Sequence, residues 1–127
     1  MERNATCSCG QLVVSCKGEP AKVSLCHCLS CQKRTGSTYG IAAFFPRAEV
    51  QSKGRSERYT RMGDSGFELT FYFCPTCGST VFWEPHRVPD IIAVAVGAFA
   101  DPTFPPPSQE VYKQHSHPWV KNLILRP

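Results

Sequence analysis

Seven of the eight cysteines in this chain lie in three short clusters. In chain order, the clusters are Cys7 and Cys9, the triplet Cys26, Cys28 and Cys31, and the pair Cys74 and Cys77. Thiolates one to three residues apart can converge on one ion with Zn–S distances of about 2.3 Å. Four thiolates close a structural site, whereas three leave one coordination position open. The pattern therefore predicts one complete four-cysteine zinc site and one incomplete three-cysteine site, where we expect the chemistry.

The two cysteine pairs are expected to share the structural zinc. Cys7 and Cys9 precede the first expected strand, and Cys74 and Cys77 lie between two later ones. A glycine follows the last cysteine of each pair, which suits the positive φ of a zinc knuckle. Structural zinc can contribute about 10 kcal/mol or more to folding, so loss of the ion should nearly abolish the fold. Free thiols or a redox C-x-x-C pair are less favoured, because no βαβ pattern surrounds them.

The 127 residues are predicted to form a single domain spanning positions 1–127. There is no long Gly/Ser tract, charge block or internal repeat that would mark a boundary. Residues 1–10 do not resemble a signal peptide, and no apolar run approaches the roughly 18 residues of a membrane span. We therefore expect a cytoplasmic protein without a membrane partner, in which clustered cysteines bind metal more often than they form disulfides.

The charge of the chain argues against a nucleic-acid partner. The net charge is +4, from 14 Lys and Arg residues spread along the sequence. A nucleic-acid footprint would be a denser basic stripe. The densest basic spot is Lys33 and Arg34, directly after Cys31, and a looser group follows at Arg55, Arg58 and Arg61. These residues form either a solvated basic face or a recruitment site for an anionic small molecule beside the metal.

The hydrophobic pattern predicts an all-β domain. Strands are expected at residues 11–17, 38–45, 57–61, 67–73, 80–83 and 91–96. One helical turn is expected at 29–34, overlapping the cysteine triplet. Residues 101–108 include four prolines and should form an extended surface strap. The segment 110–126 is expected to add an edge strand.

The ligand set of the triplet favours sulfur chemistry. Three thiolates on Zn²⁺ give a complex of net negative charge, which is a poor Lewis acid for activating water. An incoming thiol at the open position would instead be deprotonated and remain nucleophilic at neutral pH. Such a thiolate could add to an aldehyde or another carbon electrophile, and the reverse reaction would break a carbon–sulfur bond.

Two other interpretations of the triplet stay open. In one, His27 or His86 supplies a fourth ligand and the site is purely structural. In the other, the triplet binds no metal and provides only reactive thiols. The eighth cysteine, Cys16, lies in an expected strand and is interpreted as a small buried apolar residue.

The order of these motifs resembles the glutathione-dependent formaldehyde-activating enzyme family, also called the centromere-protein-V-like domain. The shared motifs are C-x-C-G at 7–10, C-H-C-x-x-C at 26–31 followed by a basic pair and T-G-S, F-C-x-x-C-G-S at 73–79, G-x-F at 97–99 and H-P-W at 117–119. They cover nearly the whole chain, and the cysteine pattern is the most specific part.

The resemblance implies a β-tent fold stapled by zinc. By analogy, Cys7, Cys9, Cys74 and Cys77 would hold the structural zinc, and Cys26, Cys28 and Cys31 would hold a catalytic zinc. Members of the family are described as carbon–sulfur lyases, and the namesake joins glutathione and formaldehyde into S-hydroxymethylglutathione. This assignment agrees with the partition of cysteines inferred from their spacing.

The resulting hypothesis is a zinc-dependent carbon–sulfur lyase acting on a thiol adduct of a small aldehyde. Zinc at the triplet would ionise a substrate thiol such as glutathione, and Lys33 or Arg34 would orient its carboxylate. Candidate proton donors are Glu84, His86, His115 and His117, and candidate pocket walls are Phe44, Phe45, Trp83 and Trp119.

Two other function classes were considered. The same domain could be a non-catalytic, zinc-stabilised binding module, but the incomplete ligand set beside a basic pair favours an enzyme. Methionine sulfoxide reduction is disfavoured, because no cysteine follows Cys77 to act as a late nucleophile.

Overall fold

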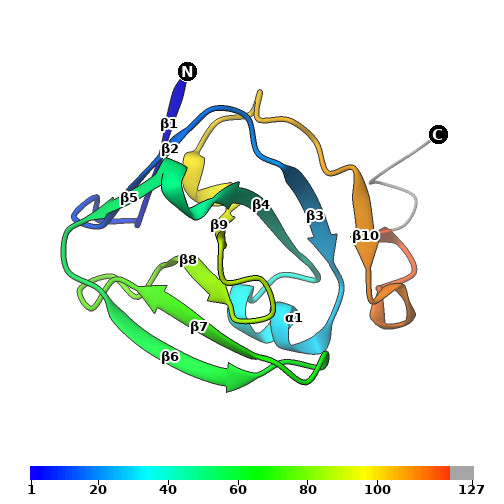
Figure 1. The fold of residues 1–127 in the computed structure, drawn as a ribbon. Coiled ribbons are helices and arrows are strands. Elements are labelled where there is room, and N and C mark those ends of the chain that lie inside the picture. Colours follow the sequence, from blue (N-terminus) through cyan, green and yellow to red (C-terminus); the bar gives the residue numbers. More distant parts are fainter. Residues whose placement is uncertain (121–127) are drawn as a thin grey trace.

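The computed structural model describes residues 1–120 of the chain and confirms a mostly β domain (Figure 1). The strands are β1 (Glu2–Thr6), β2 (Val13–Lys17), β3 (Lys22–Cys26), β4 (Gly40–Pro46), β5 (Val50–Lys53), β6 (Glu57–Met62), β7 (Glu68–Phe73), β8 (Thr80–Pro85), β9 (Ile91–Ala95) and β10 (Gln109–Val111). The helix is α1 (Leu29–Thr35), and the 3-10 turns are η1 (Arg47–Glu49), η2 (Val96–Phe99) and η3 (Lys113–His115).

The strands form two sheets. The smaller sheet has the order β1-β2-β5, and the larger has the order β10-β3-β4-β9-β8-β7-β6. Neighbouring strands pair antiparallel except β10 and β3, which are parallel. In Figure 1 the larger sheet bends, so that β10 lies at one side of the view and the β6–β7 hairpin at another. No helix in the described part is both long and apolar enough to cross a membrane.

The two faces of the larger sheet have different roles. Alternate residues such as Phe45 and Val94 belong to the main core, which also includes Val14 and Cys16 from the smaller sheet. Burying a side chain such as Phe45 stabilises the fold by about 2–3 kcal/mol. Because side chains alternate along a strand, the intervening residues point to the opposite face. There a smaller apolar group forms from Ala42, Phe71, Trp83 and Ala93, with Phe44, Leu69 and Ala95 packed against it.

The structure confirms all six expected strands and the helical turn, with shifts of a few residues at their ends. Strands β1, β3 and β5 were not predicted from the sequence. β5 carries no hydrophobic strand signal, because its sequence VQSK is polar and largely exposed. The buried position of Cys16 is as expected, since its exposure is 0%.

The two features expected near the C-terminus are a proline-rich strap and an edge strand. The segment 101–108 contains no helix or strand, as expected for a proline-rich strap. The expected edge strand corresponds to β10, which begins one residue earlier and is only three residues long. The expected segment extended to residue 126, and its part from residue 121 onward lies outside the described residues.

A glycine at position 54 allows a close contact between the segment before β2 and the loop after β5. The Gln11 side chain donates to the Arg55 carbonyl oxygen at 2.7 Å and accepts from the Arg55 amide at 2.9 Å. Gly54 has a φ of +104°, and a Cβ added there would lie 2.1 Å from the Gln11 carbonyl oxygen. Any other residue would have to displace this backbone.

Gly54→Ala is therefore expected to destabilise the protein by about 3 kcal/mol or more, because a steric clash adds to backbone strain. Gly66→Ala is the matched control: its φ is +90°, but nothing lies within 4 Å of the added Cβ. It should cost only about 1–2 kcal/mol. Chemical denaturation measures both free energies of unfolding, and equal losses would contradict the assigned role of the Gln11 contact.

Candidate metal centres

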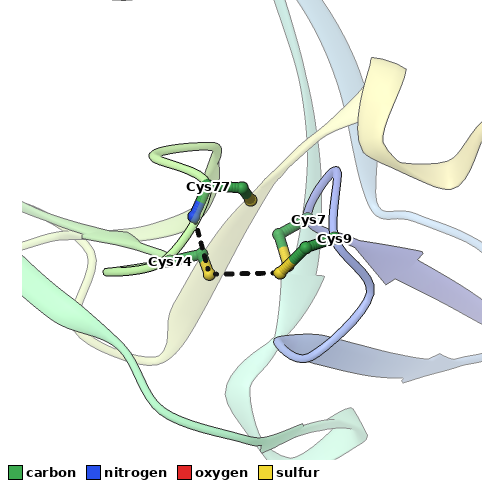
Figure 2. A group of neighbouring side chains, drawn as sticks. All are labelled: Cys7, Cys9, Cys74 and Cys77. Carbon is green, nitrogen blue, oxygen red and sulfur yellow. Dashed lines mark hydrogen bonds between the residues drawn. The ribbon is translucent and has the colours of Figure 1, made fainter.

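The four cysteines of the two pairs converge between two loops (Figure 2). Their Sγ atoms lie within 4.8 Å of one another, with 3.6 Å between Cys7 and Cys9 and 3.7 Å between Cys9 and Cys74. Sulfurs on a tetrahedral zinc at about 2.3 Å would be about 3.8 Å apart. A disulfide would require about 2.05 Å. The observed spacing therefore fits four thiolates around one ion.

Hydrogen bonds to sulfur favour the ionised state of Cys74 and Cys77, whereas at Cys9 the Gln11 backbone hydrogen bond is outweighed by burial and the neighbouring thiols, which raise the pKa to about 11. The Leu12 backbone amide donates to the Cys7 Sγ at 3.3 Å, and the Thr76 backbone amide donates to the Cys74 Sγ at the same distance. The side-chain amide of Gln11 donates through Nε2 to the Cys74 Sγ at 3.0 Å. Hydrogen bonding from the Ser79 side chain and backbone lowers the pKa of Cys77 to about 5. Such donors stabilise thiolates, which are the form that binds metal.

The glycines of the two knuckles have the backbone conformation expected from the sequence. Gly10 has a φ of +84° and Gly78 a φ of +80°. Each glycine amide closes its turn on the first cysteine of the pair: Gly10 donates to the Cys7 carbonyl oxygen at 3.1 Å and Gly78 to the Cys74 carbonyl oxygen at 2.8 Å.

The second cluster consists of Cys26, Cys28 and Cys31, whose Sγ atoms also lie within 4.8 Å of one another. Cys26 ends β3, and Cys28 is the N-cap of α1, where its Sγ accepts the Cys31 amide at 3.2 Å. The capping geometry, together with one helical turn, brings the third cysteine back toward the first two. Hydrogen bonds from the Cys26 and Cys31 thiols lower the pKa of Cys28, which marks it as the most readily ionised of the three.

Within residues 1–120, no fourth His, Cys, Asp or Glu joins this cluster. His27 is fully buried, and its Nε2 lies 2.7 Å from Glu110 Oε1. His86 places its Nε2 3.0 Å from the Thr70 hydroxyl. Both histidines that sequence analysis considered as fourth ligands are therefore engaged elsewhere in this structure.

A cavity of about 680 Å³ opens beside the three cysteines. All three cysteines line it, together with the second face of the larger sheet, including Phe44, Phe71 and Trp83. Of the predicted pocket walls, Phe44 and Trp83 thus lie in this cavity. Phe45 points into the main core instead, and Trp119 is 54% exposed and does not line the cavity.

Arg61 of β6 is a cationic side chain of this cavity whose charge acts on the cysteine triplet. It lines the cavity, its guanidinium lies 5.2 Å from the Phe71 ring centroid, and its charge contributes to lowering the pKa of Cys28. In the sequence, Arg61 stands out only as a member of a loose basic group. The signal was weak because the position of Arg61 opposite Leu69 depends on the pairing of β6 with β7.

Unlike Arg61, the basic pair Lys33 and Arg34 does not line the cavity with the three cysteines. Lys33 is exposed and lines neither of the two described cavities. Arg34 stacks on Trp83, with its guanidinium carbon 4.4 Å from a ring centroid, and lines a second cavity of about 530 Å³ that also contacts Cys77 and Ser79. The proposed substrate role of this pair stays a prediction.

Of the four candidate proton donors, one lies in the cavity with the cysteines and three lie outside it. His86 lines the cavity with the cysteines. Glu84 instead pairs with Arg47 at 2.8 Å, and His117 lies 3.0 Å from the Gln32 side-chain oxygen. The remaining candidate, His115, is exposed in η3.

Tyr112 is a cavity residue that sequence analysis did not consider. It lines the cavity with the three cysteines and has a φ of +56°, which is unusual for a non-glycine residue. Burial raises the pKa of its hydroxyl, so it carries a proton at neutral pH. Only its place after β10, which pairs with β3, brings it near Cys26, and no local pattern indicates this.

The family model for the glutathione-dependent formaldehyde-activating enzyme matches residues 2–115. The chain belongs to this family. Membership fits the two cysteine clusters and the resemblance stated from the motifs. Among curated proteins, none matches the chain.

A solved structure supports the same fold for this family member. A crystal structure of a Rhodobacter sphaeroides protein, a structural genomics target, is similar over 77% of this chain and 86% of its own, with 23% identity and a TM-score of 0.59. At this identity the likeness concerns the fold alone.

Proposed function

We propose that this protein is a zinc-dependent enzyme of the carbon–sulfur lyase type, which joins a thiol such as glutathione to an aldehyde and catalyses the reverse cleavage. The observation that carries the proposal is the three-cysteine cluster, which opens into a 680 Å³ cavity and has no fourth protein donor within residues 1–120. Family membership supports glutathione-related aldehyde activation.

The two clusters have the donor chemistry for two zinc ions. Cys7, Cys9, Cys74 and Cys77 would hold a structural ion, and Cys26, Cys28 and Cys31 a catalytic one. When bound at the triplet, zinc would supply the positive charge that ionises an incoming thiol at neutral pH.

The cavity side chains would bind and orient the two reactants. Arg61 can pair with a carboxylate of the thiol compound through charge-assisted hydrogen bonds. In the forward step the thiol sulfur bonds to the carbonyl carbon, and the electron pair of the C=O bond moves to oxygen. The thiol gives up its proton, and that oxygen takes one up; His86 and Tyr112 line the cavity and are the candidate proton donors. The step needs no oxidant or reductant.

The setting we propose is a single domain that works on a small-molecule thiol, without a nucleic-acid or membrane partner. A reducing compartment such as the cytoplasm would keep the seven clustered thiols available for metal.

The test is zinc content, ligand binding and turnover of the zinc-loaded protein. We expect two zinc ions per chain, a rise in melting temperature of several degrees with saturating reduced glutathione, and catalysed formation of a glutathione hemithioacetal from formaldehyde or a larger aldehyde. The control ligand is the oxygen analogue of glutathione, with serine in place of cysteine, which should give a much smaller rise. One zinc per chain with no response to glutathione would instead indicate a zinc-stabilised binding module.

A further inference from the structure

The cavity beside the triplet presents more apolar surface than a one-carbon aldehyde can cover. Phe44 of β4, Leu69 of β7 and Ile91 of β9 all line it, and all three are only half-buried. They lie on the same face of the larger sheet as the nearly buried Phe71 and Trp83, which form its floor. This face therefore offers accessible hydrocarbon next to the reactive cluster.

The size of the cavity fits a larger guest. Its volume of about 680 Å³ lies within the range of about 300–1,000 Å³ that is typical of sites for drug-sized ligands. Such sites combine apolar walls with a few placed polar groups. Formaldehyde has a single carbon and no apolar substituent, so it would leave the Phe44, Leu69 and Ile91 side chains in contact with water.

The polar groups of the cavity suit the other half of an adduct. Lys22 and Arg61 both line it, and each stands over an aromatic wall residue. The Lys22 ammonium is 4.9 Å from the Phe44 ring centroid, and the Arg61 guanidinium is 5.2 Å from that of Phe71. The lining also includes a third cation, Arg87, and two carboxylates, Asp64 and Glu68. Cations at separate points of one cavity match a thiol compound with two carboxylates, and the acidic residues match an ammonium group, as in glutathione.

We propose that the aldehyde partner is hydrophobic, with an aromatic or branched aliphatic substituent that packs against Phe44, Leu69 and Ile91. This inference rests on the proposed function and specifies its substrate class. The thiol sulfur lies at the cysteine triplet, the carboxylates of the thiol compound pair with Lys22 and Arg61, and the hydrocarbon substituent covers the sheet face.

The reaction keeps the same balance as with formaldehyde. The sulfur–carbon bond forms, the C=O electron pair moves to oxygen, and the thiol proton is replaced by a proton on that oxygen, giving a hemithioacetal. Only the substituent on the carbonyl carbon differs. Burial of this substituent would favour the adduct over the free reactants.

The test uses two thioethers that cannot react, S-methylglutathione and S-benzylglutathione, titrated calorimetrically into the zinc-loaded protein. The benzyl compound should bind about tenfold more tightly or better, because its ring is removed from water against the sheet. In Phe44→Ala this advantage should fall to about threefold or less, with little change for the methyl compound. Leu69→Ala is the second variant if Phe44→Ala does not fold.

The matched control is Tyr59→Ala, which removes an aromatic residue that is 59% exposed on β6 and does not line the cavity. It should keep the full preference for the benzyl compound. Equal affinities for the two thioethers, failure of both to bind, or a benzyl preference that both cavity variants retain would each overturn the inference. If glutathione binds and is turned over while the thioethers show no preference, the substrate class is wrong but the proposed function stands.

Discussion

Cys74→Ser is expected to unfold the protein at neutral pH. Cys74 is fully buried, lies 3.7 Å from Cys9 Sγ, and accepts hydrogen bonds from the Gln11 side chain and the Thr76 amide. Its loss would leave three ligands for the proposed structural zinc, whose binding can contribute about 10 kcal/mol or more to folding. The total free energy of unfolding of a small domain is about 5–15 kcal/mol. Loss of the zinc contribution would therefore remove most or all of the stability of the fold. Far-UV circular dichroism and zinc content measure the result.

The control is Cys16→Ala, which removes the buried thiol that belongs to neither cluster. It should cost only about 1–2 kcal/mol and leave the zinc content unchanged. Removal of zinc from the unmodified protein with a strong chelator should reproduce the Cys74→Ser result. A folded, cooperative Cys74→Ser protein would show that the first cluster does not staple the fold.

Cys28→Ser is expected to abolish activity while leaving the fold intact. Cys28 is both a proposed ligand and the N-cap of α1, where its Sγ accepts the Cys31 amide. Serine is a good N-cap residue, so the helix should persist. Loss of the thiolate should remove the second zinc. Mutation of residues that only hydrogen-bond to metal ligands lowers metal affinity or activity by about 10–100-fold. Loss of a ligand itself should therefore lower kcat/KM by at least about a hundredfold.

Zinc analysis, thermal denaturation and turnover distinguish the two roles of Cys28. The variant should hold one zinc per chain, unfold within a few degrees of the unmodified protein, and show no measurable turnover. Cys16→Ala again serves as the control and should remain active. Activity that survives with only two cysteines in the triplet would disprove the proposed catalytic role of the cluster.

The three cysteine clusters were predictable because each depends on local geometry, whereas the meeting of Cys9 with Cys74 depends on the fold. Two thiols one to three residues apart are brought together by a turn, whatever the rest of the chain does, and the triplet needs only the start of a short helix. The C-x-x-C pair and its following glycine act in the same way. These local turns form within short segments of the chain, so the sequence alone indicates which cysteines lie together in each cluster.

The residues around the triplet were not predictable on the same grounds. Lys33 and Arg34 adjoin the triplet in the chain, but Lys33 is exposed and Arg34 faces a different cavity. Arg61 and Tyr112 lie far away in sequence yet line the cavity with the cysteines. Neighbours along a helix diverge by about 100° per residue, whereas distant strands can place side chains on one sheet face.

The sequence by itself determined the number and kind of metal donors, their grouping into two pairs and a triplet, and the mostly β character of the chain. Only the tertiary structure decided which side chains surround the triplet and that Phe44 faces the cavity while Phe45 faces the core. The physical reason is strand register. A shift of one residue moves every side chain of a strand to the opposite face, and that register is set by pairing between segments distant in the chain.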